Sequence, residues 1–163
     1  MIEVILDDPR WAEVGFETVA RRAVTVTLNA LDLDAAQAEL ALLACDDAHI
    51  AGLNAEFRDK PGATNVLSWP EADLAPDADG GIPHAPAPDP RGVISLGDIA
   101  IAYDTCVREA AEQSKPLCDH VTHLIVHGTL HLLGYDHIRD LDATRMETVE
   151  VKLLGILGVP DPY

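Results

Sequence analysis

The sequence predicts a single α+β domain over residues 1–163, in which a small mixed four-stranded sheet packs against about five helices. Short apolar segments of strand length alternate with helical periodicity in the first two thirds of the chain, and helices dominate after position 104. A length of 163 residues fits one domain, which at this size buries about 70% of its unfolded surface.

Local signals predict the elements in order along the chain. Residues 2–6 (IEVIL) alternate as a strand does, and Asp8-Pro9 is typical of the start of a helix, which we expect over 11–31. Compact or alternating apolar runs predict three further strands, over 39–45, 66–69 and 93–103. The other helices are predicted over 49–57, 105–113, 116–133 and 142–157, the last one capped by Asp142.

The segment 70–92 has the composition of a solvated surface loop. It contains six prolines, three glycines and five acidic residues, and Arg91 is its only Lys or Arg. We expect a mobile, Pro-rich acidic insert within the domain and not a linker between two domains.

The charge balance excludes whole classes of function. Eleven Lys and Arg residues against 28 Asp and Glu give a formal net charge of −17, which argues against binding duplex DNA through a broad basic face. No apolar run approaches about 18 residues, so the sequence predicts no membrane span. Because no basic leader is visible and three cysteines cannot all pair, we expect a cytoplasmic protein with reduced thiols.

Five of the seven histidines lie between positions 120 and 137, and four of them share one side of a predicted helix. At 100° per residue, those four imidazoles fall within roughly an 80° sector, beside the apolar face that packs on the sheet. His127 and His131 stand at i and i+4, so rings on successive turns reach one metal ion. Gly134 can end the helix and let the chain turn back to deliver His137 as a third ligand.

These residues have the spacing His-x3-His-x2-Gly-x2-His, and three neutral imidazoles with a fourth position open to water are typical of a catalytic zinc site. A structural zinc site, which usually has four protein ligands, and aligned core histidines are the alternatives. The same spacing with Glu after the first histidine describes a metzincin protease, which uses that carboxylate as its general base. Gly128 occupies that position here, which argues against a peptidase.

An all-imidazole ligand set leaves the zinc charge unneutralised, which favours an anionic substrate such as a phosphodiester. Arginine grips phosphate oxygens through paired hydrogen bonds, so phosphoryl chemistry also calls for a planar cation. Basic residues are scarce, and Arg58-Asp59-Lys60 is therefore the candidate segment, with a solvated turn as the alternative interpretation.

The histidine spacing, together with three other segments, resembles the YbeY family of bacterial zinc-dependent endoribonucleases. Residues 53–58 (LNAEFR) followed by 64–70 (TNVLSWP) are similar to the family's LN-x-x-[FY]-R … T-D-V-LSFP stretch. Residues 96–101 (LGDIAI) are similar to its LGDI element, and Asp161-Pro162-Tyr163 also fits. The resemblance runs from about residue 40 onward, and Asn65 departs from it because Asp is commoner at that position.

By this resemblance, His127, His131 and His137 bind one Zn²⁺ ion per chain, and Arg58 is a functional arginine at the cleft. The implied activity is single-strand-specific endoribonuclease cleavage in 16S rRNA 3′-end maturation, rRNA processing and ribosome quality control. The implied partners are single-stranded RNA and the ribosome or small-subunit assembly factors such as the GTPase Era.

Two other functions stay open. One is a zinc peptidase or other amide hydrolase with metzincin-like spacing, which takes its general base from elsewhere in the fold. The other is a non-catalytic ribosome-assembly factor whose zinc is structural.

Other residues near the predicted metal site carry less distinctive signals. His123, one turn before His127, either contacts substrate or transfers a proton, or else is a partly buried, hydrogen-bonded histidine. We expect a catalytic His123 alongside Arg58, and a surface position for His120. Asp136 either accepts a hydrogen bond from a ligand's free N–H or stabilises the turn.

Overall fold

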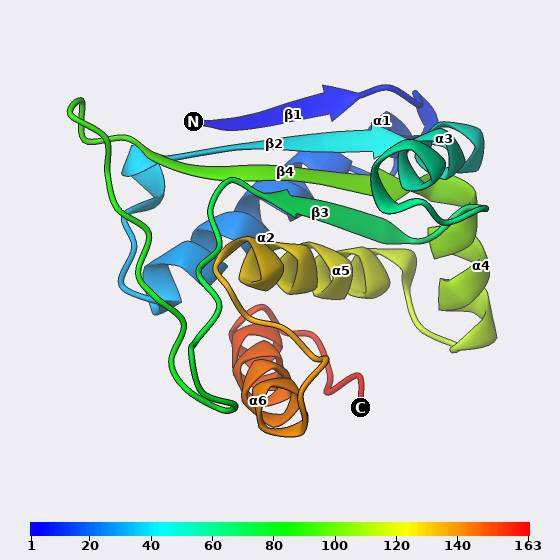
Figure 1. Cartoon of the computed structure of the whole chain (residues 1–163). Coiled ribbons are helices and arrows are strands. Elements are labelled where there is room, and N and C mark those ends of the chain that lie inside the picture. The colour runs from blue at the N-terminus through cyan, green and yellow to red at the C-terminus, as the bar shows by residue number, and fades with distance from the viewer.

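The computed structural model describes the whole chain, residues 1–163, and contains one four-stranded sheet (Figure 1). Its strands lie in the order β1-β2-β4-β3, with β1, β2 and β4 parallel and β3 antiparallel at the edge. The mixed four-stranded sheet predicted from the sequence is therefore confirmed. The strand bounds are β1 (Ile2–Leu6), β2 (Ala38–Cys45), β3 (Val66–Pro70) and β4 (Ile94–Ala102).

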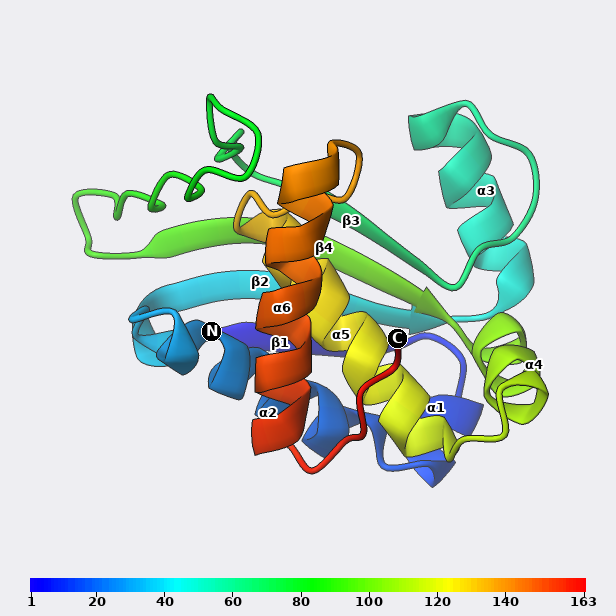
Figure 2. The same cartoon turned by 90° about the horizontal axis from the view of Figure 1, so that it is seen from below.

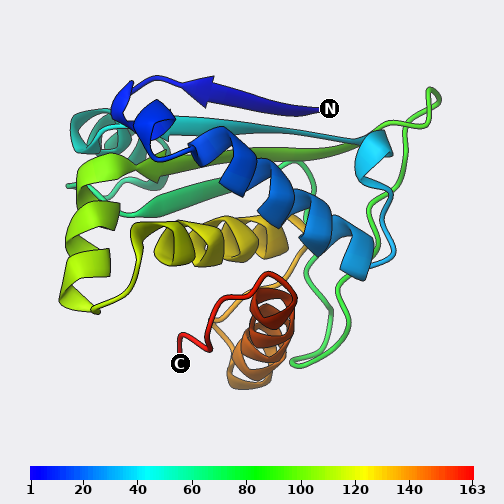
Figure 3. The same ribbon diagram turned by 180° about the vertical axis from the view of Figure 1, so that it is seen from behind.

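Six α-helices surround the sheet, one more than the approximate number predicted. Helices α2 and α5 cover one face, α3 lies at one end of the opposite face, and α6 packs on the outer side of α5 (Figures 1 and 3). No helix combines the length and the apolar character that crossing a membrane requires. The helix bounds are α1 (Arg10–Glu13), α2 (Phe16–Ala30), α3 (Asp47–Arg58), α4 (Tyr103–Glu112), α5 (Leu117–Leu132) and α6 (Asp140–Ile156), with a short 3-10 helix, η1 (Ala35–Gln37).

The single helix predicted over 11–31 is wrong, because the structure has α1 and α2 in its place. The break falls at Gly15, whose φ of 68° lies in the left-handed region and cannot continue a right-handed helix. The apolar residues on either side keep helical spacing, so periodicity alone did not reveal the interruption.

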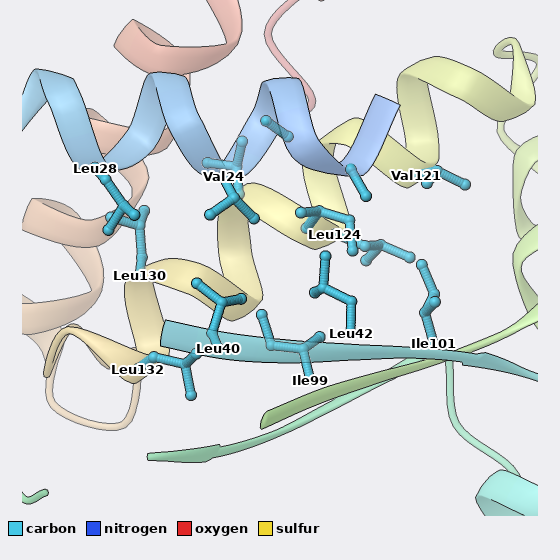
Figure 4. Close-up of a cluster of buried hydrophobic side chains, with 14 of the residues drawn as sticks. Val24, Leu28, Leu40, Leu42, Ile99, Ile101, Val121, Leu124, Leu130 and Leu132 are labelled. Atoms are coloured by element: carbon cyan, nitrogen blue, oxygen red, sulfur yellow. The ribbon is translucent and has the colours of Figure 1, made fainter. Parts of the chain in front are cut away.

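The main core lies between the sheet and the two helices α2 and α5 (Figure 4). Ile99 on β4 points into this layer, whereas its neighbour Ala100 faces the opposite side, in a smaller cluster with Ile50 of α3. Strand β4 is therefore buried on both faces, and it anchors α5 on one side and α3 on the other. The labelled core residues of Figure 4 are Val24, Leu28, Leu40, Leu42, Ile99, Ile101, Val121, Leu124, Leu130 and Leu132.

The Pro-rich segment between β3 and β4 is tied to the start of α6 by specific hydrogen bonds. Asp142 lies inside α6, so the prediction that it caps the helix is wrong. Its carboxylate accepts hydrogen bonds from Gly80 N–H at 2.8 Å and from Arg139 Nε at 2.6 Å. Its own backbone N–H donates to Asp79 Oδ1 at 2.8 Å, so the loop satisfies a donor that the first turn of the helix leaves free.

Replacing Asp142 with asparagine is expected to lower the thermal stability in a pH-dependent way. The Gly80 N–H, followed by Arg139, holds the pKa of Asp142 below its ordinary value of 3.8. Because the folded pKa is the lower one, this stabilisation is present above about pH 4 and is lost as the pH falls through the folded pKa. Thermal unfolding of wild type and Asp142→Asn should differ at pH 7, and the difference should shrink as the pH is lowered below about 4.

The matched control is Asp140→Asn, which changes an exposed aspartate in the same first turn of α6. Its melting temperature at pH 7 should stay close to that of wild type. Equal melting temperatures for the two variants would contradict an anchoring function for Asp142.

Candidate metal centre and active site

Helix α5 carries three histidines on successive turns of one side. His123, His127 and His131 are partly exposed, while Leu124, Ile125, Leu130 and other residues of the same helix are buried in the core. The ring centroids of His127 and His131 are 4.5 Å apart, as the i, i+4 spacing predicts. The buried face of α5 fixes the helix against the sheet, and this fixes the direction in which the imidazoles point.

The turn after α5 brings a third imidazole back to the first two. Gly134 has a φ of 93°, and Tyr135 N–H bonds back to Leu130 C=O at 3.0 Å, which closes the helix end in a Schellman-type turn. The His137 ring centroid then lies 5.3 Å from that of His127 and 5.0 Å from that of His131. The predicted function of Gly134 as the point where the chain turns back is confirmed.

The three imidazoles form a set that fits a metal ion. One ring nitrogen from each of His127, His131 and His137 lies within 4.8 Å of the others, and the Nε2 atoms of His127 and His131 are 3.0 Å apart. His131 Nδ1 bonds Tyr135 C=O at 2.9 Å, and His127 Nδ1 bonds Glu150 Oε1. Because these partners occupy the Nδ1 atoms, the Nε2 atoms of both rings are left to bind a metal.

The environment of His131 keeps its ring in the form that binds metals. Burial, followed by the neighbouring His127 and His137, lowers the pKa of His131 to about 4. This imidazole is therefore neutral at pH 7, and a neutral ring is required for coordination.

Glu150 of α6 is completely buried directly behind the histidine cluster, where it bonds His127. Burial acts to raise its pKa, but hydrogen bonds from His123, His127 and Tyr163 outweigh burial and lower the pKa to about 2. The carboxylate is therefore ionised at neutral pH. Sequence reasoning missed this residue, although an acid between the apolar positions Met146 and Leu153 on one helix face was a detectable signal.

A pocket of about 650 Å³ opens beside the histidine cluster and contains the predicted arginine. Arg58 is the last residue of α3, and its Nη2 donates to the carbonyl of Ser68 on the edge strand β3. His131 and His137 line the same pocket, so the fold brings Arg58 to two side chains of the histidine cluster over a long sequence separation. Lys60 adds a second positive charge to the pocket, while the carboxylates of Glu71, Asp73 and Asp136 lie on its wall.

The other histidines of the cluster lie outside this pocket. His123 is partly buried, and its Nε2 lies 3.3 Å from Glu150 Oε2, which matches the hydrogen-bonded alternative considered for it. The surface position predicted for His120 is wrong, because its exposed fraction is 3% and its Nε2 bonds Glu109 at 3.0 Å. Asp136 accepts from His137 N–H at 2.7 Å, so it stabilises the turn.

Replacing Gly134 with alanine is expected to destabilise the fold by about 1–3 kcal/mol and to loosen the His137 turn. A Cβ at this position would lie 2.5 Å from the carbonyl oxygen of Leu74, and the left-handed φ is strained for alanine. Thermal or urea unfolding measures the loss. Gly155→Ala is the control, because that helical position is open, and it should be neutral or up to about 1 kcal/mol more stable. Equal stability of Gly134→Ala and wild type would contradict this account of the turn.

Comparisons with known proteins show which family this chain is similar to. A model of the family described as Endoribonuclease YbeY matches residues 6–158. The chain is 59% identical over 162 residues to an Endoribonuclease YbeY of Ruegeria pomeroyi, an alignment that covers 99% of this chain and 97% of that protein. A corresponding protein of Dinoroseobacter shibae is 58% identical, with 99% and 90% covered.

A solved structure supports the fold independently of close sequence similarity. The solution structure of TM1509 from Thermotoga maritima matches with a TM-score of 0.57 and 18% identity, over 97% of this chain and 92% of its own. At that identity the likeness extends to the fold alone. The family match over residues 6–158 and the near-full-length relatives establish that this chain belongs to the Endoribonuclease YbeY family.

Proposed function

We propose that the chain is a single metallo-endoribonuclease domain that cleaves single-stranded RNA and holds one Zn²⁺ ion through His127, His131 and His137. The observation that carries this proposal is the convergence of three imidazoles beside a pocket that contains an arginine. An all-imidazole set suits zinc better than magnesium or calcium, which prefer oxygen ligands. When bound, zinc supplies Lewis acidity and lowers the pKa of a coordinated water.

Arg58 is proposed to bind the phosphate of the scissile bond. Its guanidinium has five N–H donors, and the structure uses Nη2 for the Ser68 carbonyl, so donors remain for phosphate oxygens. The Ser68 contact also holds the side chain across the edge of β3, which reduces the conformational entropy lost on binding. Lys60, in the same pocket, adds a point charge near the substrate backbone.

The charge distribution favours a substrate that another partner presents. The pocket contains two cations and three carboxylates, and the chain as a whole carries a formal charge of −17. Such a surface binds naked RNA weakly and in a salt-sensitive way. From the resemblance to the YbeY family, we propose that this protein acts in the cytoplasm on 16S rRNA during 3′-end maturation and quality control. The charge distribution supports the further proposal that the ribosome or assembly factors such as Era supply selectivity.

The peptidase alternative meets a steric obstacle in the structure. A Cβ at Gly128 would lie 3.2 Å from Ile99 Cδ1, so a side chain there would point into the packed sheet. A glutamate at that position has no room to act as a general base in the pocket. The geometry therefore argues against a metzincin-type base at position 128, and a peptidase would have to take its general base from elsewhere in the fold.

The experiment that tests the proposal compares substrates with and without metal. Unstructured RNA, duplex RNA and casein are incubated with the protein, then with a chelator, and then with added Zn²⁺. We expect cleavage of unstructured RNA alone, its loss with chelator and its recovery with zinc. Casein cleavage with intact RNA would overturn the proposal in favour of a peptidase.

The ends of the RNA products identify the attacking group. Products that carry a 2′,3′-cyclic phosphate would assign attack to the ribose 2′-OH, whereas their absence would favour water. Both outcomes are compatible with metal-dependent cleavage at this site.

Two variants test the assembly-factor alternative and the function of His123. A folded His127→Ala variant that still supports ribosome maturation would favour the assembly factor with structural zinc.

For His123 we propose proton transfer next to the metal site, and His123→Gln should then lower the cleavage rate without loss of metal. An unchanged rate would leave His123 as a hydrogen-bonded partner of Glu150.

A further inference from the structure

Glu150 collects hydrogen bonds from three side chains, although no solvent reaches it. Its Oε1 bonds His127 Nδ1, and its Oε2 bonds the hydroxyl of Tyr163 and lies 3.3 Å from His123 Nε2. A buried carboxylate is costly unless it is paired and hydrogen-bonded, and these donors offset that cost. The arrangement links α6 to α5 directly behind the histidine cluster.

The end of the chain completes this cluster. After α6 the chain doubles back, and its last segment runs beside α5 (Figure 2). Tyr163 packs edge-on against His123, with ring centroids 5.7 Å apart, and its hydroxyl reaches the carboxylate of Glu150. A residue far from the histidine motif in sequence therefore holds the carboxylate oxygen that does not bond His127.

The orientation of His127 depends on this carboxylate. An imidazole whose Nδ1–H is held by an acceptor presents Nε2 in a fixed direction and is a stronger donor to a metal. The His127 Nε2 atom lies 3.0 Å from His131 Nε2, on the side of the ring away from Glu150. The contact with Glu150 thus selects the tautomer and the ring orientation that the three-histidine site requires.

We propose that Glu150 is a positioning residue for the metal ligand His127 and that Tyr163 holds Glu150 in place through the hydrogen bond from its hydroxyl. This inference rests on the proposed metal site. It goes beyond that site by assigning part of the metal affinity to two residues outside the ligand set.

A second arrangement of the same residues makes a different prediction. His123, His127 and Glu150 also have potential ligand atoms within 4.8 Å of one another. If Glu150 were itself a ligand at a second site, wild type would bind two metal ions and loss of the carboxylate would change the stoichiometry. If Glu150 positions His127, the stoichiometry stays at one and only the affinity changes.

The test measures Zn²⁺ affinity and stoichiometry at pH 7 by competition with a chromophoric chelator, without any RNA. Glu150→Gln should bind one zinc about 10–100-fold more weakly than wild type. Tyr163→Phe, which removes only an exposed residue's hydroxyl, should lose about three- to tenfold. Glu147→Gln is the control, because Glu147 is exposed one turn earlier on the same helix, and its affinity should not change.

A spectroscopic readout on wild type keeps the proposal testable even if Glu150→Gln fails to fold. In ¹H–¹⁵N spectra of the zinc-loaded protein, the imidazole proton of His127 should sit on Nδ1 and exchange slowly with water. In Tyr163→Phe that proton should exchange faster. A proton on Nε2 of His127, or exchange unaffected by Tyr163→Phe, would overturn the proposal.

The affinity results separate this proposal from the metal site itself. If wild type binds no zinc, the metal site and the positioning function fall together. If wild type binds one zinc and Glu150→Gln binds it equally well, only the positioning function falls. A loss of one zinc out of two in Glu150→Gln would also overturn positioning, because it would make Glu150 a ligand.

Discussion

Replacing His131 with alanine is expected to abolish tight zinc binding and to lower the rate of RNA cleavage about a thousandfold or more. His131 contributes one of the three converging imidazoles, and two remaining histidines bind zinc far more weakly. A metal ion supplies several kcal/mol of transition-state stabilisation, and each factor of ten in rate corresponds to about 1.4 kcal/mol. Metal content and single-turnover cleavage of an unstructured RNA measure both effects.

His131 is the most informative ligand to remove because its Nδ1 bonds a backbone carbonyl and not Glu150. The variant therefore leaves the Glu150 cluster intact. His84→Ala is the matched control, since His84 is exposed in the Pro-rich loop and should be dispensable for metal binding. Full cleavage by a folded, zinc-free His131→Ala protein would contradict a catalytic metal.

Replacing Arg58 with alanine is expected to leave zinc bound and to lower cleavage about 10²–10³-fold. This is the loss typical when one preorganised donor to a developing negative charge is removed. Arg58 lines the pocket with His131 and His137 but belongs to α3, so its removal leaves the ligands untouched. Unchanged cleavage by this variant would remove Arg58 from the active site.

Arg58→Lys tests whether Arg58 acts through its positive charge alone or through paired hydrogen bonds to two phosphate oxygens. Lysine keeps the positive charge but cannot bond two phosphate oxygens in one plane, so we expect only partial activity. Arg22→Ala, which changes an exposed arginine of α2, serves as the control and should cleave like wild type. Thermal unfolding of each variant accounts for the Ser68 contact that Arg58→Ala loses.

The convergence of the three histidines was predictable because the signal is local. His127, His131, Gly134 and His137 lie within one helix and its terminal turn, where 3.6 residues per turn and one left-handed glycine determine the geometry. The sheet was predictable for a related reason, since each strand is a short apolar run. Composition made Arg58 a candidate, and the family resemblance was needed to single it out. Its position beside His131 and His137 depends on the tertiary fold, which local sequence signals do not show.

The residues that sequence analysis missed depend on packing between distant elements. Glu150 is on α6, and only the crossing of α6 over α5 carries its carboxylate to His127 (Figure 2). Tyr163 fitted a family motif, but its function as a donor follows from the path of the last residues. His120 was misplaced for the same reason, because its acceptor Glu109 comes from α4. Periodicity describes a face, and it does not say which neighbour covers that face.

The acidic loop changes how the net charge of −17 is understood. Asp79 accepts a hydrogen bond from the backbone N–H of Asp142 at the start of α6, so this carboxylate stabilises the fold. Glu71 and Asp73 lie on the wall of the pocket, where they oppose polyanion binding at close range. The expected consequence is weak binding to arbitrary RNA at physiological salt, and tight salt-insensitive binding would contradict it.

One titration tests the central claim most directly. Metal-free protein is titrated with Zn²⁺ while bound zinc and cleavage of a single-stranded RNA are measured in the same samples. We predict that cleavage is absent at the start, rises in proportion to bound zinc and reaches its maximum at one ion per chain. Cleavage by the metal-free protein, or intact RNA in the presence of protein carrying one zinc per chain, would contradict the account.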